Sequence, residues 1–177
     1  GCSISGIPNN YVEDISLSNI KILFAAGRRL DSESGTNADA TKEMPENEDH
    51  YPEGTGWGML PAYGFYIRHV KGISLNNIEL KYQGKDVRPA LVADDVEEMN
   101  VSEFRAQVDS SALSLILLKN VNDVVVQSSK ALSPVQTFVA VHGKSSAIAL
   151  IANDTRNAKQ VFHSEVPHGV KTEANLR

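Results

Sequence analysis

The chain has 177 residues, of which 41% are hydrophobic and 22% are charged, and its formal net charge is −5. This length and composition predict one domain with a sizeable core. The 17 Lys and Arg residues are scattered, which excludes the concentrated basic face that a nucleic-acid partner requires. No apolar run approaches the roughly 18 residues of a transmembrane helix, so we expect no membrane span. The single cysteine, Cys2, excludes an internal disulfide.

A short motif recurs along the chain. Residues 12–22 and 70–80 share the pattern V-x-x-I-S-L-x-N-I-x-[IL], and weaker copies begin at Val96 and Val121. The copies that begin at Val70, Val96 and Val121 follow one another after 26 and 25 residues, whereas 58 residues separate Val12 from Val70. The longer gap is either two periods with a remainder or one period with a long insertion. A period of about 25 residues indicates a repeat architecture.

Each repeat contains two strands. The last three copies each follow a second apolar run that ends in a polar pair, and these runs are residues 65–69, 91–95 and 116–120. Within the first copy Ile15 and Leu17 alternate with serines, which is strand periodicity, and the alternation shifts at Asn19, a residue suited to a turn. The runs are short and rich in Val and Ile, which argues against helices.

Strand–turn–strand units of this length cannot bury an apolar face alone, so they must stack. We therefore predict an all-β fold, a right-handed parallel β-helix of about five coils that forms a single domain over residues 1–177. A β-propeller blade would need a period of roughly 40 residues or more. A leucine-rich repeat would need a Leu-Asn signature and a helical return, which the sequence lacks.

Two segments depart from the repeat. Residues 24–62 are rich in glycine and charge, and we expect a long surface loop whose apolar residues dock on the solenoid. Residues 137–152 predict one or two final strands, and residues 153–177 a polar C-terminal cap or tail. Residues 1–10 are too short for a cap, so we expect an open solenoid end that is capable of self-association.

Several segments together resemble the C-terminal coils of bacterial glycoside hydrolase family 28, which contains polygalacturonases and rhamnogalacturonan-cleaving enzymes. They are residues 3–8 (SISGIP), 11–20 (YVEDISLSNI), 51–53 (YPE), 57–58 (WG), 60–70 (LPAYGFYIRHV), 88–89 (RP) and 94–96 (DDV). The resemblance covers roughly residues 3–107 and fades beyond. It implies a parallel β-helix, a pectic polysaccharide or oligosaccharide as partner, and a secreted or periplasmic location.

The family motifs that carry catalysis are missing. Asn-Thr-Asp, Gly-Asp-Asp, Gly-His-Gly and Arg-Ile-Lys, which in the family precede the matched region, do not occur here. The resemblance implies a parent enzyme that hydrolyses galacturonan or rhamnogalacturonan by inversion, with one carboxyl group as acid and another that activates water. We expect no catalytic residues in this chain and no activity from it alone. The alternative is a stand-alone carbohydrate-binding or structural β-helix module. A lyase or esterase would need a basic or Ser/His centre, which the sequence does not assemble.

Five residues are candidates for substrate binding. Trp57, Tyr51 and Tyr63 could stack on sugar rings, although the simpler interpretation is that these aromatic residues only pin the loop to the solenoid. Arg68 and Arg88 could each pair with the carboxylate of a uronic acid, and a structural ion pair is the alternative.

Other polar residues have simpler interpretations. Asp94-Asp95 occupies the same place in the repeat as Arg68-His69 and Lys119-Asn120, which predicts a turn rather than an acid/base pair. His142 is expected at a strand end. The histidines show no close ligand spacing, so we expect no metal and no cofactor.

Overall fold

The computed structural model describes residues 1–25, 40–41, 43–46, 58–165 and 169–177. Its strands follow one another along the chain without an intervening α-helix in these residues. They are β1 (Cys2–Ser5), β2 (Val12–Phe24), β3 (Phe65–Tyr82), β4 (Leu91–Ala106), β5 (Ile116–Gln127), β6 (Lys130–Ala131), β7 (Val135–His142), β8 (Ser146–Ile151), β9 (Ala158–Ser164) and β10 (Val170–Glu173). None of the described residues belongs to a helix that could cross a membrane.

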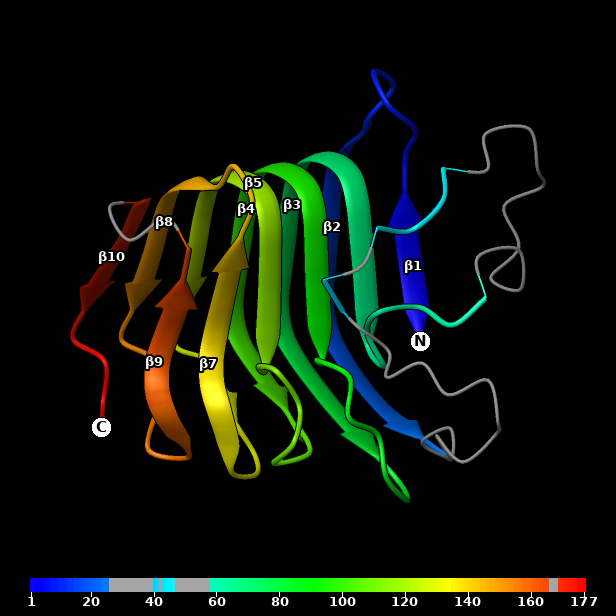
Figure 1. The fold of residues 1–177 in the computed structure, drawn as a ribbon. Coiled ribbons are helices and arrows are strands. Elements are labelled where there is room, and N and C mark those ends of the chain that lie inside the picture. Colours follow the sequence, from blue (N-terminus) through cyan, green and yellow to red (C-terminus); the bar gives the residue numbers. More distant parts are fainter. Residues whose placement is uncertain (26–39, 42, 47–57, 166–168) are drawn as a thin grey trace.

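Every pairing between these strands is parallel, and the chain climbs from one rung to the next in sequence order. One ladder joins β1, β3, β4, β5, β7 and β9, while β2 pairs with β3 and β8 lies between β5 and β10. Figure 1 shows the rungs side by side, from β1 near the N-terminus to β9 and β10 near the C-terminus. The predicted parallel β-helix is therefore confirmed.

The register confirms the repeat and explains its irregular first spacing. Val12, Val70, Val96 and Val121 are successive Cα partners, so equivalent positions of the motif lie directly above one another. Because Val12 pairs with Val70 itself, the 58-residue gap is one period with a long insertion. The insertion leaves β2 at Phe24 and the chain re-enters the ladder at Phe65.

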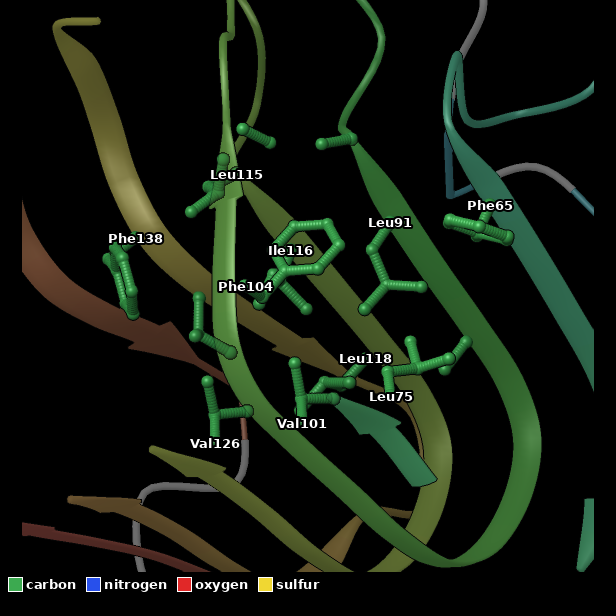
Figure 2. Packing of buried hydrophobic residues seen from close by; sticks show 14 of the residues in the cluster. Phe65, Leu75, Leu91, Val101, Phe104, Leu115, Ile116, Leu118, Val126 and Phe138 are labelled. Carbon is green, nitrogen blue, oxygen red and sulfur yellow. The ribbon is translucent and has the colours of Figure 1, made fainter. Parts of the chain in front are cut away.

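The core consists of stacks of apolar side chains that point inward from successive rungs. Leu75, Val101 and Val126 form one stack and are fully buried, as Figure 2 shows. Phe65, Leu91 and Ile116 form another stack on a neighbouring wall of the solenoid. Each of these side chains is covered above and below by its own equivalent, so the burial of one rung depends on its neighbours.

The long strands bend at residues in the left-handed backbone region. The ladder skips these positions: Arg68 pairs with Asp94 and Val70 with Val96, whereas His69 lies between two paired residues and has a φ of 50°. Asn and Asp tolerate this conformation better than other non-glycine residues, which explains their frequency at the corners. The corner residues fall into three columns: His69, Asp95, Asn120 and Gly143; Asp14, Gly72, Glu98, Asp123 and Ala147; and Asn19, Asn77, Glu103, Ser128, Ala152 and Ala174.

Residues 153–177 continue the solenoid. β9 pairs with β7 and β10 pairs with β8, so the segment predicted as a cap or tail contains a further rung. Its polarity reflects hydrogen bonding at the corner, where the buried amide of Asn153 accepts from the Ser129 backbone N–H and donates to the Val126 carbonyl. Residues 137–152 contain most of β7 and all of β8, which confirms the strands predicted there, but they are not the final strands, because β9 and β10 follow.

The first rung lies at the opposite end. Among the described residues β2 pairs only with β3, and its inward side chains Ile15, Leu17, Ile20 and Ile22 are only partly buried. This edge has the features expected of an open solenoid end, and self-association through it stays a prediction.

The insertion covers part of the outer wall of the solenoid. Outward-facing Tyr66, Val92, Leu117 and Ala140 are buried in a second apolar cluster together with Ala40, Leu60 and Ala62, and Met44 packs against it. Residues 43–46 are thereby held beside the corner that follows Arg68.

A charge placed in one stack should unfold the protein. Ile73 is 2% exposed and lies between Ile15 and Met99. Ile73→Asp removes the apolar contacts and buries an unpaired charge, which should cost at least about 4 kcal/mol of unfolding free energy. Ser74→Asp, on the adjacent outward position, is the control and should melt within a few degrees of the parent. Equal thermal melting of the two variants would contradict the stacking register.

Candidate functional site

The candidate site is a hollow of about 350 Å³ at one corner of the solenoid, which we call the corner groove. Its lining comes from four rungs and from the insertion: Glu43, Arg68, His69, Asp94, Asp95, Lys119, Asn120 and Lys144. Arg68, Asp94, Lys119 and His142 are register partners, so each rung contributes its residues at the same place, about 5 Å from the next. The turn predicted at each polar pair is confirmed by the positive φ of His69, Asp95 and Asn120.

The local backbone fixes the shape of the groove at Asn120 and Gly143. The Asn120 side-chain oxygen accepts a hydrogen bond of 3.1 Å from the Lys144 backbone N–H. A Cβ atom at Gly143, whose φ is +63°, would lie 2.3 Å from the same oxygen. Glycine is therefore required at this corner, and it lets Lys144 follow on the rim of the groove.

His69 lies between two carboxylates. Its Nδ1 is 2.6 Å from Asp95 Oδ2, and its Nε2 is 3.0 Å from Glu46 Oε2. The ring is 6% exposed, and Tyr11 packs edge-on against it with ring centroids 6.0 Å apart. An ionised carboxylate only accepts hydrogen bonds, so an imidazolium ring can donate to both neighbours, whereas a neutral ring can donate to one.

Asp95 holds Tyr11 in its neutral form. The Tyr11 hydroxyl donates a hydrogen bond of 2.7 Å to Asp95 Oδ2, the oxygen that also faces His69. This hydrogen bond, with a smaller contribution from burial, raises the pKa of Tyr11 to about 12. Tyr11, Asp95, His69 and Glu46 thus form a continuous chain of polar contacts from the first rungs to the insertion.

Arg68 holds the insertion against the groove. Its Nη1 donates to the Met44 carbonyl oxygen at 2.8 Å, and its Nη2 donates to Glu46 Oε1. Its Nε is buried and makes no hydrogen bond of good geometry with the described residues. The buried Tyr66 hydroxyl also lacks one and interacts with the Arg68 side chain. Burial raises the pKa of Tyr66, which keeps this hydroxyl protonated at neutral pH.

The next rungs pair their own charges. Lys119 Nζ lies 3.2 Å from Asp94 Oδ2, and the Asn120 amide donates to Asp94 Oδ1 at 3.1 Å. Asp94 is 6% exposed, so both oxygens of this carboxylate are occupied inside the wall of the groove. Lys144 is an exposed cation on the rim.

Of the three predicted binding residues that the structure describes, Arg68 lines the groove, whereas Tyr63 and Arg88 do not. Arg88 lies elsewhere: its guanidinium forms an ion pair of 2.6 Å with buried Asp86 and donates to the carbonyls of Leu60 and Ala62. This contact anchors the end of the insertion to the solenoid. Arg88 therefore forms a structural ion pair, which was the predicted alternative to binding a uronic acid.

Tyr63, the aromatic candidate that the structure describes, does not line the groove. Tyr63 is 1% exposed, contacts Phe24 and Tyr82 edge-on, and donates its hydroxyl to the Gln107 carbonyl. Its ring therefore has no free face for a sugar. Tyr51 and Trp57 lie outside the described residues, so their predicted stacking role stays a prediction.

The remaining histidine candidate behaves as a strand end. His142 is the last residue of β7, as predicted, and its Nδ1 lies 3.1 Å from Glu165. Among the described residues no group of three His, Cys, Asp or Glu side chains is placed to hold a metal ion.

Sequence reasoning missed most of the groove. Tyr11, Glu46, Lys119, Asn120 and Lys144 were not predicted as site residues, although the polar pairs at 68–69, 94–95 and 119–120 were assigned to one place in the repeat. If those pairs are stacked on successive rungs, Lys119 and Asn120 are expected to lie beside Asp94. No sequence signal linked Glu46 to His69, because the contact depends on how the insertion docks.

Comparisons with known proteins give no relative for this chain: no family model, no curated protein and no solved structure matches it. The resemblance to glycoside hydrolase family 28 therefore rests on the sequence motifs alone.

The contact between Asp95 and Tyr11 predicts a pH response. The carboxylate stabilises the neutral phenol, so the contact's contribution to stability is complete below pH 10 and is lost as the pH rises through about 12. In Asp95→Asn, which suits the left-handed backbone at this corner, the pKa of Tyr11 should fall from about 12 toward 10. Carbon NMR of labelled tyrosine measures this. Asp123→Asn, at another corner, should leave the pKa unchanged, and an equal effect of both variants would contradict the contact.

Proposed function

We propose that this chain is the β-helical, polymer-binding part of a pectin-degrading glycoside hydrolase of the family 28 type, and that it binds acidic pectic chains without cleaving them. The parent enzyme, secreted or periplasmic, would hydrolyse galacturonan or rhamnogalacturonan linkages by inversion. The sequence motifs supply the family, and the corner groove supplies a place for the ligand.

The observation that carries the proposal is a row of cations on separate rungs. Arg68, Lys119 and Lys144 all line the corner groove. Arg68 lies two rungs from Lys119, with Asp94 on the rung between them, and Lys144 follows on the rung after Lys119; adjacent rungs are about 5 Å apart. Such a row suits an extended chain that bears a carboxylate on each sugar ring, because several rungs can contact several rings. The amide of Asn120 adds a neutral group that can bond to sugar hydroxyls.

The carboxylates of the groove support binding without hydrolysis. Inverting hydrolysis needs an acid and a base about 6.5–9.5 Å apart with room for a water molecule between them. Asp94 is occupied by Lys119 and Asn120, and Asp95 by His69 and Tyr11. Both oxygens of Asp94 and Oδ2 of Asp95 are therefore engaged by protein groups, and Asp95 supplies only its Oδ1 to the groove.

A structural module without a ligand is the second candidate. Two of the three cations already have a partner within the protein, because Glu46 pairs with Arg68 and Asp94 with Lys119. Charge neutralised in this way stabilises the corner and the insertion and requires no sugar.

Binding to oligogalacturonides separates the two candidates. Isothermal titration calorimetry should detect binding of an oligogalacturonide and not of the matched neutral galacto-oligosaccharide. Lys144→Gln removes a rim cation and should weaken binding about threefold to tenfold, which corresponds to one charge-assisted contact. Lys171→Gln, on exposed β10, is the control for the change in net charge. Absence of binding by folded wild-type protein would favour the structural module.

The absence of hydrolysis is tested separately. The purified chain, incubated with polygalacturonate and rhamnogalacturonan, should release no new reducing ends. Release that disappears in Asp95→Asn would contradict the proposed division between binding and catalysis.

A further inference from the structure

Glu46 is held by two groups that together form a seat for one carboxylate. Its Oε1 accepts from Arg68 Nη2, and its Oε2 lies 3.0 Å from His69 Nε2. Arg68 and His69 are 9% and 6% exposed, and both belong to β3. The seat is therefore part of the rigid wall of the solenoid, whereas its occupant comes from a segment outside the strands.

Glu46 does not satisfy every hydrogen-bond donor of the seat. Arginine binds carboxylates most strongly when two parallel N–H groups meet the two oxygens. Glu46 uses one N–H of Arg68 and turns its second oxygen toward His69, while the buried Nε of Arg68 makes no hydrogen bond of good geometry with the described residues. Most buried polar groups in proteins are satisfied, so an unused donor beside a carboxylate seat indicates that another ligand geometry is possible.

We propose that Glu46 is an internal stand-in for the carboxylate of an acidic sugar, and that the ligand binds by displacing Glu46 from Arg68 and His69. In the bound form the ligand carboxylate meets the Nε and Nη2 of Arg68. The Met44 carbonyl keeps its bond to Nη1, so residues 43–46 need not leave the groove. This inference rests on the proposed function for the identity of the sugar and adds a means by which the site limits its own affinity.

The exchange is energetically balanced. The ligand replaces one carboxylate by another at the same cation, so no buried charge is left unpaired. The side chain of Glu46 is 36% exposed, so a ligand can approach it from the open side of the groove and water can receive it after displacement. An internal competitor raises the apparent dissociation constant in inverse proportion to the fraction of time for which the seat is free. Removal of the competitor should therefore strengthen binding.

The test uses galacturonate as the probe and galactose as the neutral match. Glu46→Gln should bind galacturonate at least tenfold more tightly than the wild-type protein, measured by calorimetry or by chemical-shift titration. Glu173→Gln makes the same change in net charge on exposed β10, outside the lining of the groove, and should match the wild type. Glu46→Ala should reproduce the gain, and galactose should bind none of the proteins.

A second variant locates the gain at the seat. Adding Arg68→Gln to Glu46→Gln should abolish the tighter binding, with the fold of each variant checked by thermal melting. An unchanged affinity in Glu46→Gln, or an equal gain in Glu173→Gln, overturns the inference.

The outcome is separable from that of the proposed function. If wild-type protein binds oligogalacturonide in a Lys144-dependent manner but Glu46→Gln gains nothing, the stand-in role fails and the proposed function remains. If Glu46→Gln binds galacturonate tightly while no variant binds the polymer, the seat is established and pectin binding fails.

Discussion

Stacking of equivalent side chains between parallel rungs is the interaction on which the rest of this structure depends. Val12, Val70, Val96 and Val121 are successive partners, and each inner position of the motif repeats this arrangement. No rung has an apolar core of its own, because its inward side chains are covered only by those of the rungs on either side. The in-register ladder therefore fixes the core and the position of every corner at the same time.

The corners turn a repeat in sequence into a site. Residues with positive φ let the chain bend while the flanking residues stay paired. In each polar pair the second residue forms the corner and the first residue precedes it, so the pairs of successive rungs are aligned in a row. Arg68, Asp94 and Lys119 are about 25 residues apart in sequence and lie on neighbouring rungs. A row with alternating charge neutralises itself, and Lys119 and Asp94 show this directly.

The insertion changes the chemistry of that row. Its apolar residues Ala40, Leu60 and Ala62 cover an outer wall that would otherwise expose Tyr66 and Val92, and this docking brings Glu46 to the corner. The result is a groove in which one carboxylate of the wall, Asp95, orients His69, while a carboxylate of the insertion occupies its other side. Solenoid and insertion therefore contribute different parts of one site.

The sequence by itself determined the repeat, the strand periodicity and the turn at each polar pair, because these features depend on local spacing and on the backbone preferences of residues such as Asn19 and Asn120. It also placed Arg68, Asp94 and Lys119 at one position of the repeat. Only the tertiary structure decided that Val12 pairs with Val70 across the insertion, that Arg88 forms an ion pair with Asp86, and that Tyr63 is buried. It alone joined Glu46 and Tyr11 to the corner, because contacts between a non-repeating segment and a repeating wall have no periodic signal in the sequence and arise only when the segment docks.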